Sequence, residues 1–158
     1  IRGGTLLVLR RIAMQLDTWD QLGTPSKEEV IGRKLSNGAP LTGVNETDVP
    51  DLGARHPNGL LVIPDFAHIR RAAPQETTER IFRRPFSYDN GINERGSMDV
   101  GLLWTAYQRD ISKQYLPIQR RLEKLDLLNE WTVPIGSAVF AIPGGVQGSE
   151  LLAEALFS

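Results

Sequence analysis

Alternating apolar and polar positions predict four strands along this chain. The run Gly4–Met14 mixes aliphatic residues with two arginines and suits a strand that is buried on at least one face. Arg80–Tyr88 and Val100–Gln108 are also strand-like, and the Asn- and Gly-containing segment Asp89–Ser97 between them predicts a hairpin. Both faces of Val100–Gln108 are apolar, so we expect both to be covered. Thr132–Ile142 is the last predicted strand.

Capping signals and helical spacing predict three helices. Thr24–Ile31 contains a cap, a helix start and a short helix, which Gly32 is expected to end. Apolar residues at helical spacing predict a helix within Ile111–Leu128, with Pro117 in its first turn. Ser149–Phe157 has the pattern of a short terminal helix capped by its serine.

A long loop separates the first helix from the hairpin. Residues Ser36–Gly59 are rich in Asn, Gly, Pro, Asp and Thr, so this segment is either functional, as the wall of an access channel, or an unconstrained surface loop. The element order is then β, α, long loop, β, β, α, β, α. This is the order of a ferredoxin-like βαββαβ sandwich with an antiparallel sheet and an extra C-terminal helix, an α+β class.

Composition narrows the possible chemistry. A chain of 158 residues that is 41% hydrophobic fits one globular domain. Its 18 basic and 19 acidic residues provide no broad field for nucleic acid or an anionic membrane, and its apolar runs are too short to span a bilayer. The absence of cysteine excludes disulfides, thiolate catalysis and Cys-based metal sites. Because the chain starts at Ile1 without a leader, we expect a piece of a processed or divided protein.

Two histidines remain as candidate metal ligands. His56 lies in the long loop and has no evident ligand role, so we interpret it as a loop residue. His68 is flanked by aliphatic residues, where a histidine is more often a packed core or loop residue than a ligand. One histidine is nevertheless sufficient as the axial ligand of haem iron, because the porphyrin supplies the other four nitrogens.

Several segments together carry a family resemblance that covers almost the whole chain. In order and spacing they resemble the C-terminal half of dye-decolorising peroxidases: LLVLRRIAM, IGRKLSNGAPL, DFAHIRRAAP, RIFRRPFSYDNGI, DVGLLWTAYQRD, YLPIQRRL, LNEW and GSAVFAIPGGV. The resemblance implies two ferredoxin-like domains in one polypeptide, with haem b (protoporphyrin IX iron) in the C-terminal one. Residues 1–158 would then be that haem-binding domain. Similarity to the branch with exported deferrochelatase-like enzymes slightly favours an extracytoplasmic location.

The resemblance assigns His68 as the proximal iron ligand. A ligating imidazole should donate its other N–H to an acceptor, and our candidate is Glu130, with Asp99 second. Each of these carboxylates has the alternative of being solvated or of capping a helix. Arg83 matches the distal arginine, which would hold hydrogen peroxide and stabilise negative charge as the O–O bond breaks. Without the resemblance, Arg83 would be interpreted as a surface arginine on a strand.

Further residues match the haem pocket of the family. Leu102 and Trp104 correspond to a pair, commonly Leu and Phe, that covers the distal face of the haem. Trp104 either fills the same apolar wall, which we prefer, or serves as an oxidisable radical site. Arg70 and Arg84 are candidate partners for the haem propionates, since guanidinium can pair with carboxylate in a bidentate way.

Bulky donors cannot enter a tight pocket, so their oxidation would pass through surface residues that form stable radicals. Tyr88 matches a tyrosine to which the family assigns this role, and Trp131 is a second candidate; ordinary packing is the alternative for both. Pro85 and Gln75 depart from the family pattern, which often has Gly and Arg at these positions.

The family's GxxDG motif, which supplies a distal aspartate as proton shuttle, is absent from this chain. We therefore expect a haem peroxidase that oxidises dyes or phenolics with hydrogen peroxide only together with its N-terminal half, as a companion chain or a lost segment. The alternatives are a noncatalytic haem-binding module, a deferrochelatase-like haem-handling protein, or a ferredoxin-like protein without cofactor. The natural donor and any homo-oligomeric state are left open.

Overall fold

The computed structural model describes residues 3–94, 96–146 and 148, which group into two compact units. The predicted terminal helix Ser149–Phe157 lies outside the described residues. No helix among the described residues is both long and apolar enough to cross a membrane. The first unit comprises Ile1–Met14, Glu76–Pro117 and Pro134–Ser158, and the second comprises Gln15–Gln75 and Ile118–Val133.

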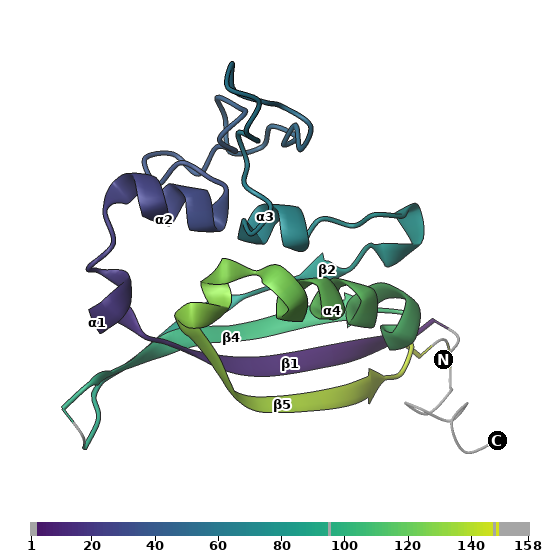
Figure 1. Ribbon diagram of the computed structural model, residues 1–158. Coiled ribbons are helices and arrows are strands. Elements are labelled where there is room, and N and C mark those ends of the chain that lie inside the picture. The colour runs from purple at the N-terminus through teal and green to yellow at the C-terminus, as the bar shows by residue number, and fades with distance from the viewer. Residues whose placement is uncertain (1–2, 95, 147, 149–158) are drawn as a thin grey trace. The chain divides into compact units, whose positions relative to one another are not determined.

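An antiparallel sheet forms the first unit (Figure 1). The strand order is β2–β4–β1–β5, and β3 also pairs with β4. This order places the two long central strands, β1 and β4, side by side, as a ferredoxin-like βαββαβ arrangement requires. The strands are β1 (Thr5–Met14), β2 (Phe82–Arg83), β3 (Phe86–Ile92), β4 (Met98–Gln108) and β5 (Thr132–Ile142).

The predicted hairpin forms, with two differences. Its turn is shorter than Asp89–Ser97, because β3 continues to Ile92 and β4 already begins at Met98. The first arm is also divided, since the segment predicted as one strand becomes β2 and β3 with Pro85 between them. Proline has no N–H to donate to a ladder, and it is tolerated here because this arm lies at the edge of the sheet.

The pairing register assigns each side chain to one face of the sheet. Leu102 lies opposite Ile12, and Ala106 lies opposite Val8. Side chains that are directly opposite share a face, and faces alternate along a strand. We call the face that holds Leu102, Trp104 and Ala106 the Leu102 face. Val8, Val100 and Ala106 are buried, so the core of this unit follows this face.

Helices and a long loop form the second unit. Thr24–Ile31 is a helix as predicted, and Gly32 ends it with a left-handed φ of 85°. The segment Ile111–Leu128 is not one helix: a π-helical turn precedes α4, and a short 3-10 helix follows it. The helical elements of this unit are α1 (Leu16–Trp19), α2 (Thr24–Ile31), α3 (His68–Arg71), most of α4 (Leu116–Leu125) and η3 (Leu127–Glu130). Two further turns belong to the first unit: the 3-10 turn η1 (Thr77–Glu79) and the π-helical turn η2 (Ile111–Tyr115).

Side chains at the start of the long loop bind its main chain. Nη1 of Arg33 donates to the carbonyl oxygens of Gly38 at 2.6 Å and Glu46 at 3.0 Å. Nζ of Lys34 donates to the carbonyl of Gly43 at 2.7 Å. The interpretation of residues 36–59 as an unconstrained loop is therefore wrong, whereas the role as a channel wall stays a prediction.

Asp48 closes a tight turn within this loop. Its Oδ2 accepts hydrogen bonds from the backbone N–H groups of Asn45 at 2.9 Å and Val44 at 2.7 Å. These donors, that of Asn45 first, lower the pKa of the Asp48 carboxyl below its usual 3.8 because they stabilise the carboxylate. The turn is thus held by an ionised side chain.

Candidate functional site

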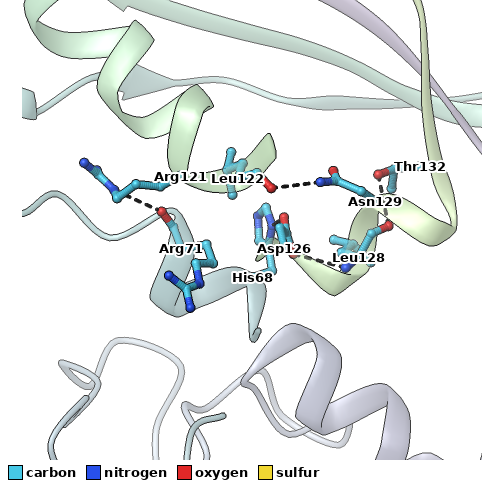
Figure 2. A network of polar contacts seen from close by, with 8 residues as sticks. All are labelled: His68, Arg71, Arg121, Leu122, Asp126, Leu128, Asn129 and Thr132. Carbon is cyan, nitrogen blue, oxygen red and sulfur yellow. Dashed lines mark hydrogen bonds and ion pairs between the residues drawn. The ribbon is translucent and has the colours of Figure 1, made fainter. Parts of the chain in front are cut away.

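His68 and Asp126 form a short polar contact in the second unit (Figure 2). Nδ1 of His68 lies 2.6 Å from Oδ2 of Asp126, although 58 positions separate the two residues in the sequence. The Asp126 side chain is 3% exposed and that of His68 is 32% exposed. The carboxylate is thus enclosed by protein, while part of the imidazole reaches solvent.

Main-chain contacts fix Asp126 in this position. It is the N-cap of η3, and its Oδ1 accepts a hydrogen bond from the N–H of Leu128 at 3.1 Å. The next residue, Leu127, donates its N–H to the carbonyl of Phe66 at 3.1 Å, which joins the η3 segment to the chain just before His68. Asp126 can therefore orient the imidazole without adjusting its own position.

The contact determines which nitrogen of His68 is available. Where the Asp126 carboxylate accepts this hydrogen bond, Nδ1 carries the proton, and Nε2 of a neutral ring then keeps its lone pair. Within the described part of the chain, Nε2 has no hydrogen-bond partner. An imidazole with one anchored nitrogen and one free nitrogen fits an axial iron ligand, which needs a single protein nitrogen. Residues 3–94, 96–146 and 148 contain no group of three or more metal-ligating side chains.

The structure corrects the predicted acidic partner of His68. Glu130 is exposed at the end of η3 and has no polar partner among the residues described. Asp99 belongs to the first unit, where its Oδ2 lies 3.2 Å from Nη2 of Arg11 and accepts a hydrogen bond from Nδ2 of Asn90 at 2.9 Å. Asp126 takes the role that we expected of these two carboxylates.

The sequence does not single out Asp126, because apolar spacing favours an unbroken helix through residue 128. A helix-interior aspartate has no special meaning, whereas an aspartate in front of a second, short helix is a typical N-cap. The signal that could have revealed it was the run of polar and apolar residues LDLLNE, which fits a cap as well as a continuing helix. Its pairing with His68 depends on tertiary structure.

Arg70 also has a role that the sequence did not predict. Its Nη2 donates to the carbonyl oxygens of Ile63 at 2.6 Å and Leu52 at 2.7 Å. Its Nε is shared between the carbonyls of Ile63 and Pro64, both at 3.1 Å. Because three of its five N–H groups bind the main chain, Arg70 clamps the end of the long loop to α3 instead of presenting a free guanidinium fork to a propionate.

Arg83 lies on the same face of the sheet as the predicted distal wall. It pairs with Ala106, so its side chain belongs to the Leu102 face, together with Leu102 and Trp104. The guanidinium is exposed and has no hydrogen-bond or ion-pair partner among the described residues. Three residues that the resemblance assigned to one pocket are thus placed together by strand register.

The same register separates Arg84 from this group. Its N–H donates to the carbonyl of Thr105 at 3.0 Å, so Arg84 continues the pairing opposite Thr105 and points to the other face. Arg84, a predicted propionate partner, therefore lies on the opposite face of the sheet from Arg83. Trp104 lies beside Tyr115, with their ring centroids 5.9 Å apart, which is the packing contact expected of an apolar wall.

The two predicted radical residues are both half-buried. Tyr88 pairs with Gly101, so its side chain lies on the other face of the sheet from the Leu102 face. Its hydroxyl is buried, and the Arg11 guanidinium lies 4.6 Å from its ring centroid. Trp131 packs edge-on against Trp19 at 5.2 Å in the second unit. The buried Tyr88 hydroxyl differs from the surface position that we expected.

Comparison with known proteins identifies the family of this chain. A family model described as "Dyp-type peroxidase, C-terminal" matches residues 1–147. The chain is 44% identical over 151 residues to the dye-decolorizing peroxidase of Thermobifida fusca, covering 94% of this chain and 35% of that protein. It is 35% identical over 158 residues to a deferrochelatase of Escherichia coli O6:K15:H31, covering 98% of this chain and 37% of that protein.

Solved structures give the same result. The crystal structure of a DyP-type peroxidase from Cellulomonas bogoriensis matches 98% of this chain with a TM-score of 0.93 and 52% identity. An oxyferrous complex of DtpA from Streptomyces lividans matches 98% with a TM-score of 0.91 and 38% identity. This chain covers 43% of each of those two chains.

The chain therefore belongs to the DyP-type peroxidase family and corresponds to its C-terminal part. The α+β ferredoxin-like fold that the element order predicted is confirmed by these structural matches. The chain spans 35 to 37% of the length of the curated relatives it matches. The activity of the whole protein is therefore a proposal.

Proposed function

We propose that this chain is the haem-binding part of a peroxidase that oxidises bulky aromatic donors with hydrogen peroxide. The observation that carries the proposal is the His68–Asp126 contact, which leaves Nε2 of a well-anchored imidazole free. A haem-binding role is supported by the oxyferrous complex of DtpA, to which this chain is 38% identical. His68 would hold the iron through Nε2, and haem b is the form that the family resemblance favours.

Asp126 is the positioning residue in this mechanism. Its carboxylate accepts the Nδ1–H of His68, which fixes the tautomer and the ring plane and makes the ligating nitrogen more basic. A bound haem would supply the electrons for peroxide reduction, and a more basic His68 nitrogen would favour this reaction by donating electron density to its iron. The 3% exposure of the Asp126 side chain keeps water from competing for the imidazole N–H.

Arg83 would act on the peroxide. An unpaired guanidinium on the Leu102 face can bind a peroxide oxygen and stabilise the negative charge that develops as the O–O bond breaks. Leu102 and Trp104 would line the same side and exclude water. Overall, one H₂O₂ accepts two electrons and two protons to give two H₂O, and each of two donors loses one electron and one proton.

The chain lacks the GxxDG motif that would supply a carboxylate to move the peroxide proton. Arginine is permanently charged and cannot act as this base at neutral pH. We therefore propose that full activity requires the N-terminal half implied by the family resemblance; the relatives that the chain matches are longer than it is.

Absorbance spectroscopy after haem addition tests the proposal. His68→Ala should abolish or shift the Soret band, whereas His56→Ala, which alters the exposed loop histidine, should leave it unchanged. With the N-terminal half present, Arg83→Leu should slow the reaction with peroxide by about 100-fold, in line with the loss of one preorganised donor. An unchanged Soret band in His68→Ala and an unchanged rate in Arg83→Leu would together refute it.

A second candidate is a haem-handling protein without peroxidase turnover. It is favoured by the curated relatives named deferrochelatase, which are 35 to 37% identical to the chain over 98% of its length. Stopped-flow spectra with haem and peroxide, recorded with and without the N-terminal half, separate the two candidates. Peroxide-dependent spectral change only with both halves supports the peroxidase, and tight haem binding without any such change supports the second candidate.

A further inference from the structure

An open hollow lies at one end of the sheet in the first unit. Its volume is about 460 Å³, and it is shallow and wide open to solvent. It is bordered by the segment that enters β2, the end of β4, the start of β1 and one side chain of η2. None of the residues assigned above to iron, peroxide or the apolar wall lines this hollow.

The charge of the hollow is positive. Arg80 and Arg109 line it, and the lining contains no acidic residue. Both arginines are exposed, and within the described part of the chain neither guanidinium has a hydrogen-bond or ion-pair partner. Two uncompensated guanidinium groups at one concave site favour an anion, and they suit planar oxyanions such as sulfonate or carboxylate.

Two aromatic rings lie beside these cations. Phe82 and Tyr107 pair across β2 and β4, and their ring centroids are 6.2 Å apart at an interplanar angle of 48°. Phe82 is 61% exposed, so its ring is accessible to a ligand. A planar aromatic group could stack on it, while its charged substituent pairs with an arginine.

Gln114 holds the two arginine-bearing segments together. Its Oε1 accepts hydrogen bonds from the N–H groups of Arg109 at 2.8 Å and Asp110 at 3.0 Å, and its Nε2 donates to the carbonyl of Arg80. One side chain thus joins the end of β4 to the segment that leads into β2. The backbone of the hollow is therefore formed before any ligand binds.

Gln108 borders the hollow at the end of β4. It is buried, and its Nε2 donates to the carbonyl of Leu6 at 2.9 Å. Its Oε1 is also buried but has no hydrogen-bond partner among the residues described. Strand register places the Gln108 side chain on the Leu102 face, opposite to the face of Phe82 and Tyr107, so it takes no part in binding a group on those rings.

We propose that this hollow binds planar aromatic anions and, resting on the function proposed above, serves as a docking site for the reducing donor. Arg80 and Arg109 would bind the anionic group, and Phe82 and Tyr107 would stack on the ring. Such a donor remains at the surface, which suits substrates too large for a haem pocket.

Calorimetric titration without peroxide tests binding alone. The probe is 6-hydroxynaphthalene-2-sulfonate, with uncharged 2-naphthol as its comparison. We expect Arg80→Gln and Arg109→Gln each to weaken the sulfonate affinity about tenfold and Phe82→Ala to weaken it severalfold. The matched control Arg120→Gln, an exposed arginine of α4, should leave the affinity unchanged. Affinity should fall with salt, since the arginines are exposed.

Equal affinity for both probes would overturn the proposed binding site. So would an unchanged sulfonate affinity in the Arg80→Gln/Arg109→Gln double variant, provided that its circular dichroism is native. Steady-state oxidation of the sulfonate by the haem-loaded protein with its N-terminal half tests the docking role. We expect the double variant to raise KM at least tenfold with kcat nearly unchanged, and an unchanged KM overturns this role. Specific binding without oxidation by the native protein refutes the proposed peroxidase while the binding site stands.

Discussion

Replacing Gly32 with alanine tests how the second unit positions the helix that begins with His68. Gly32 ends α2 with φ at 85°, a conformation that L residues rarely adopt. A Cβ at this position would lie 2.2 Å from Cγ2 of Ile69 and 3.2 Å from Cγ2 of Ile63. Because the first distance is far below van der Waals contact, the Ile69 side chain or the backbone of α2 or α3 must shift to admit the methyl group.

Two costs add in this variant. The left-handed backbone costs an alanine about 1 to 2 kcal/mol, and forcing a methyl group into a packed site costs typically about 1 to 3 kcal/mol. The free energy of unfolding should therefore fall by about 2 to 5 kcal/mol. This is a large share of the roughly 5 to 15 kcal/mol that is typical of a folded domain.

Urea denaturation of Gly32→Ala and Gly59→Ala separates the two costs. Gly59 has the same φ of 85°, but no atom lies within 4 Å of its would-be Cβ, so that variant should lose only about 1 to 2 kcal/mol. The two variants should differ by at least about 1 kcal/mol. If they are equally stable, the contact with Ile69 contributes nothing and the reasoning is refuted.

Three further predictions concern the loop and the sheet. Arg70→Leu removes the hydrogen bonds to main-chain carbonyls and should lower the free energy of unfolding of this segment by about 2 to 4 kcal/mol. Amide exchange over residues 52–64 should become faster, and unchanged exchange would contradict the prediction. Because the pKa of Asp48 is lowered in the folded state, its contribution to the stability of the loop is present at neutral pH and is lost as the pH falls below 3.8. The NMR shifts of the amides in its turn should therefore titrate with pH, and they should not titrate in Asp48→Asn. Gly101→Ala places a Cβ 2.0 Å from the carbonyl oxygen of Ile12 and should lower the melting temperature by at least about 5 °C. Gly136→Ala is the control, because the atom nearest to its new Cβ is 3.8 Å away, and it should change the melting temperature far less. Equal melting temperatures of the two variants would argue against the contact at Gly101.

The strands were predictable because their side chains alternate, and the errors arose where that signal is weak. Asp89–Ile92 and Met98 continue the hairpin although they are polar or exposed, since pairing at an open edge requires no apolar side chain. Pro85 was identified as unusual, but only the edge position of its strand explains why it interrupts the ladder without ending the pairing.

The site was predictable only in part. His68 could be selected because the chain has two histidines and no cysteine, and the family resemblance pointed to the same residue. Its partner could not, because Asp126 meets it only after two segments 58 positions apart fold together. The role of Arg70 was hidden for another reason: its acceptors are carbonyl oxygens, which every residue possesses and which leave no trace in a pattern of side chains.

The anchored imidazole has a consequence for engineering. His68 and Asp126 both belong to one compact unit, whereas Arg83 and its neighbours on the sheet belong to the other. Substituting Asp126 by Glu or Asn would therefore retune the electron-donating strength of the imidazole while leaving the strand that bears the guanidinium untouched. In the proposed peroxidase, substitutions at Asp126 would act on the iron ligand, and substitutions at Arg83 would act on peroxide binding, from two different compact units.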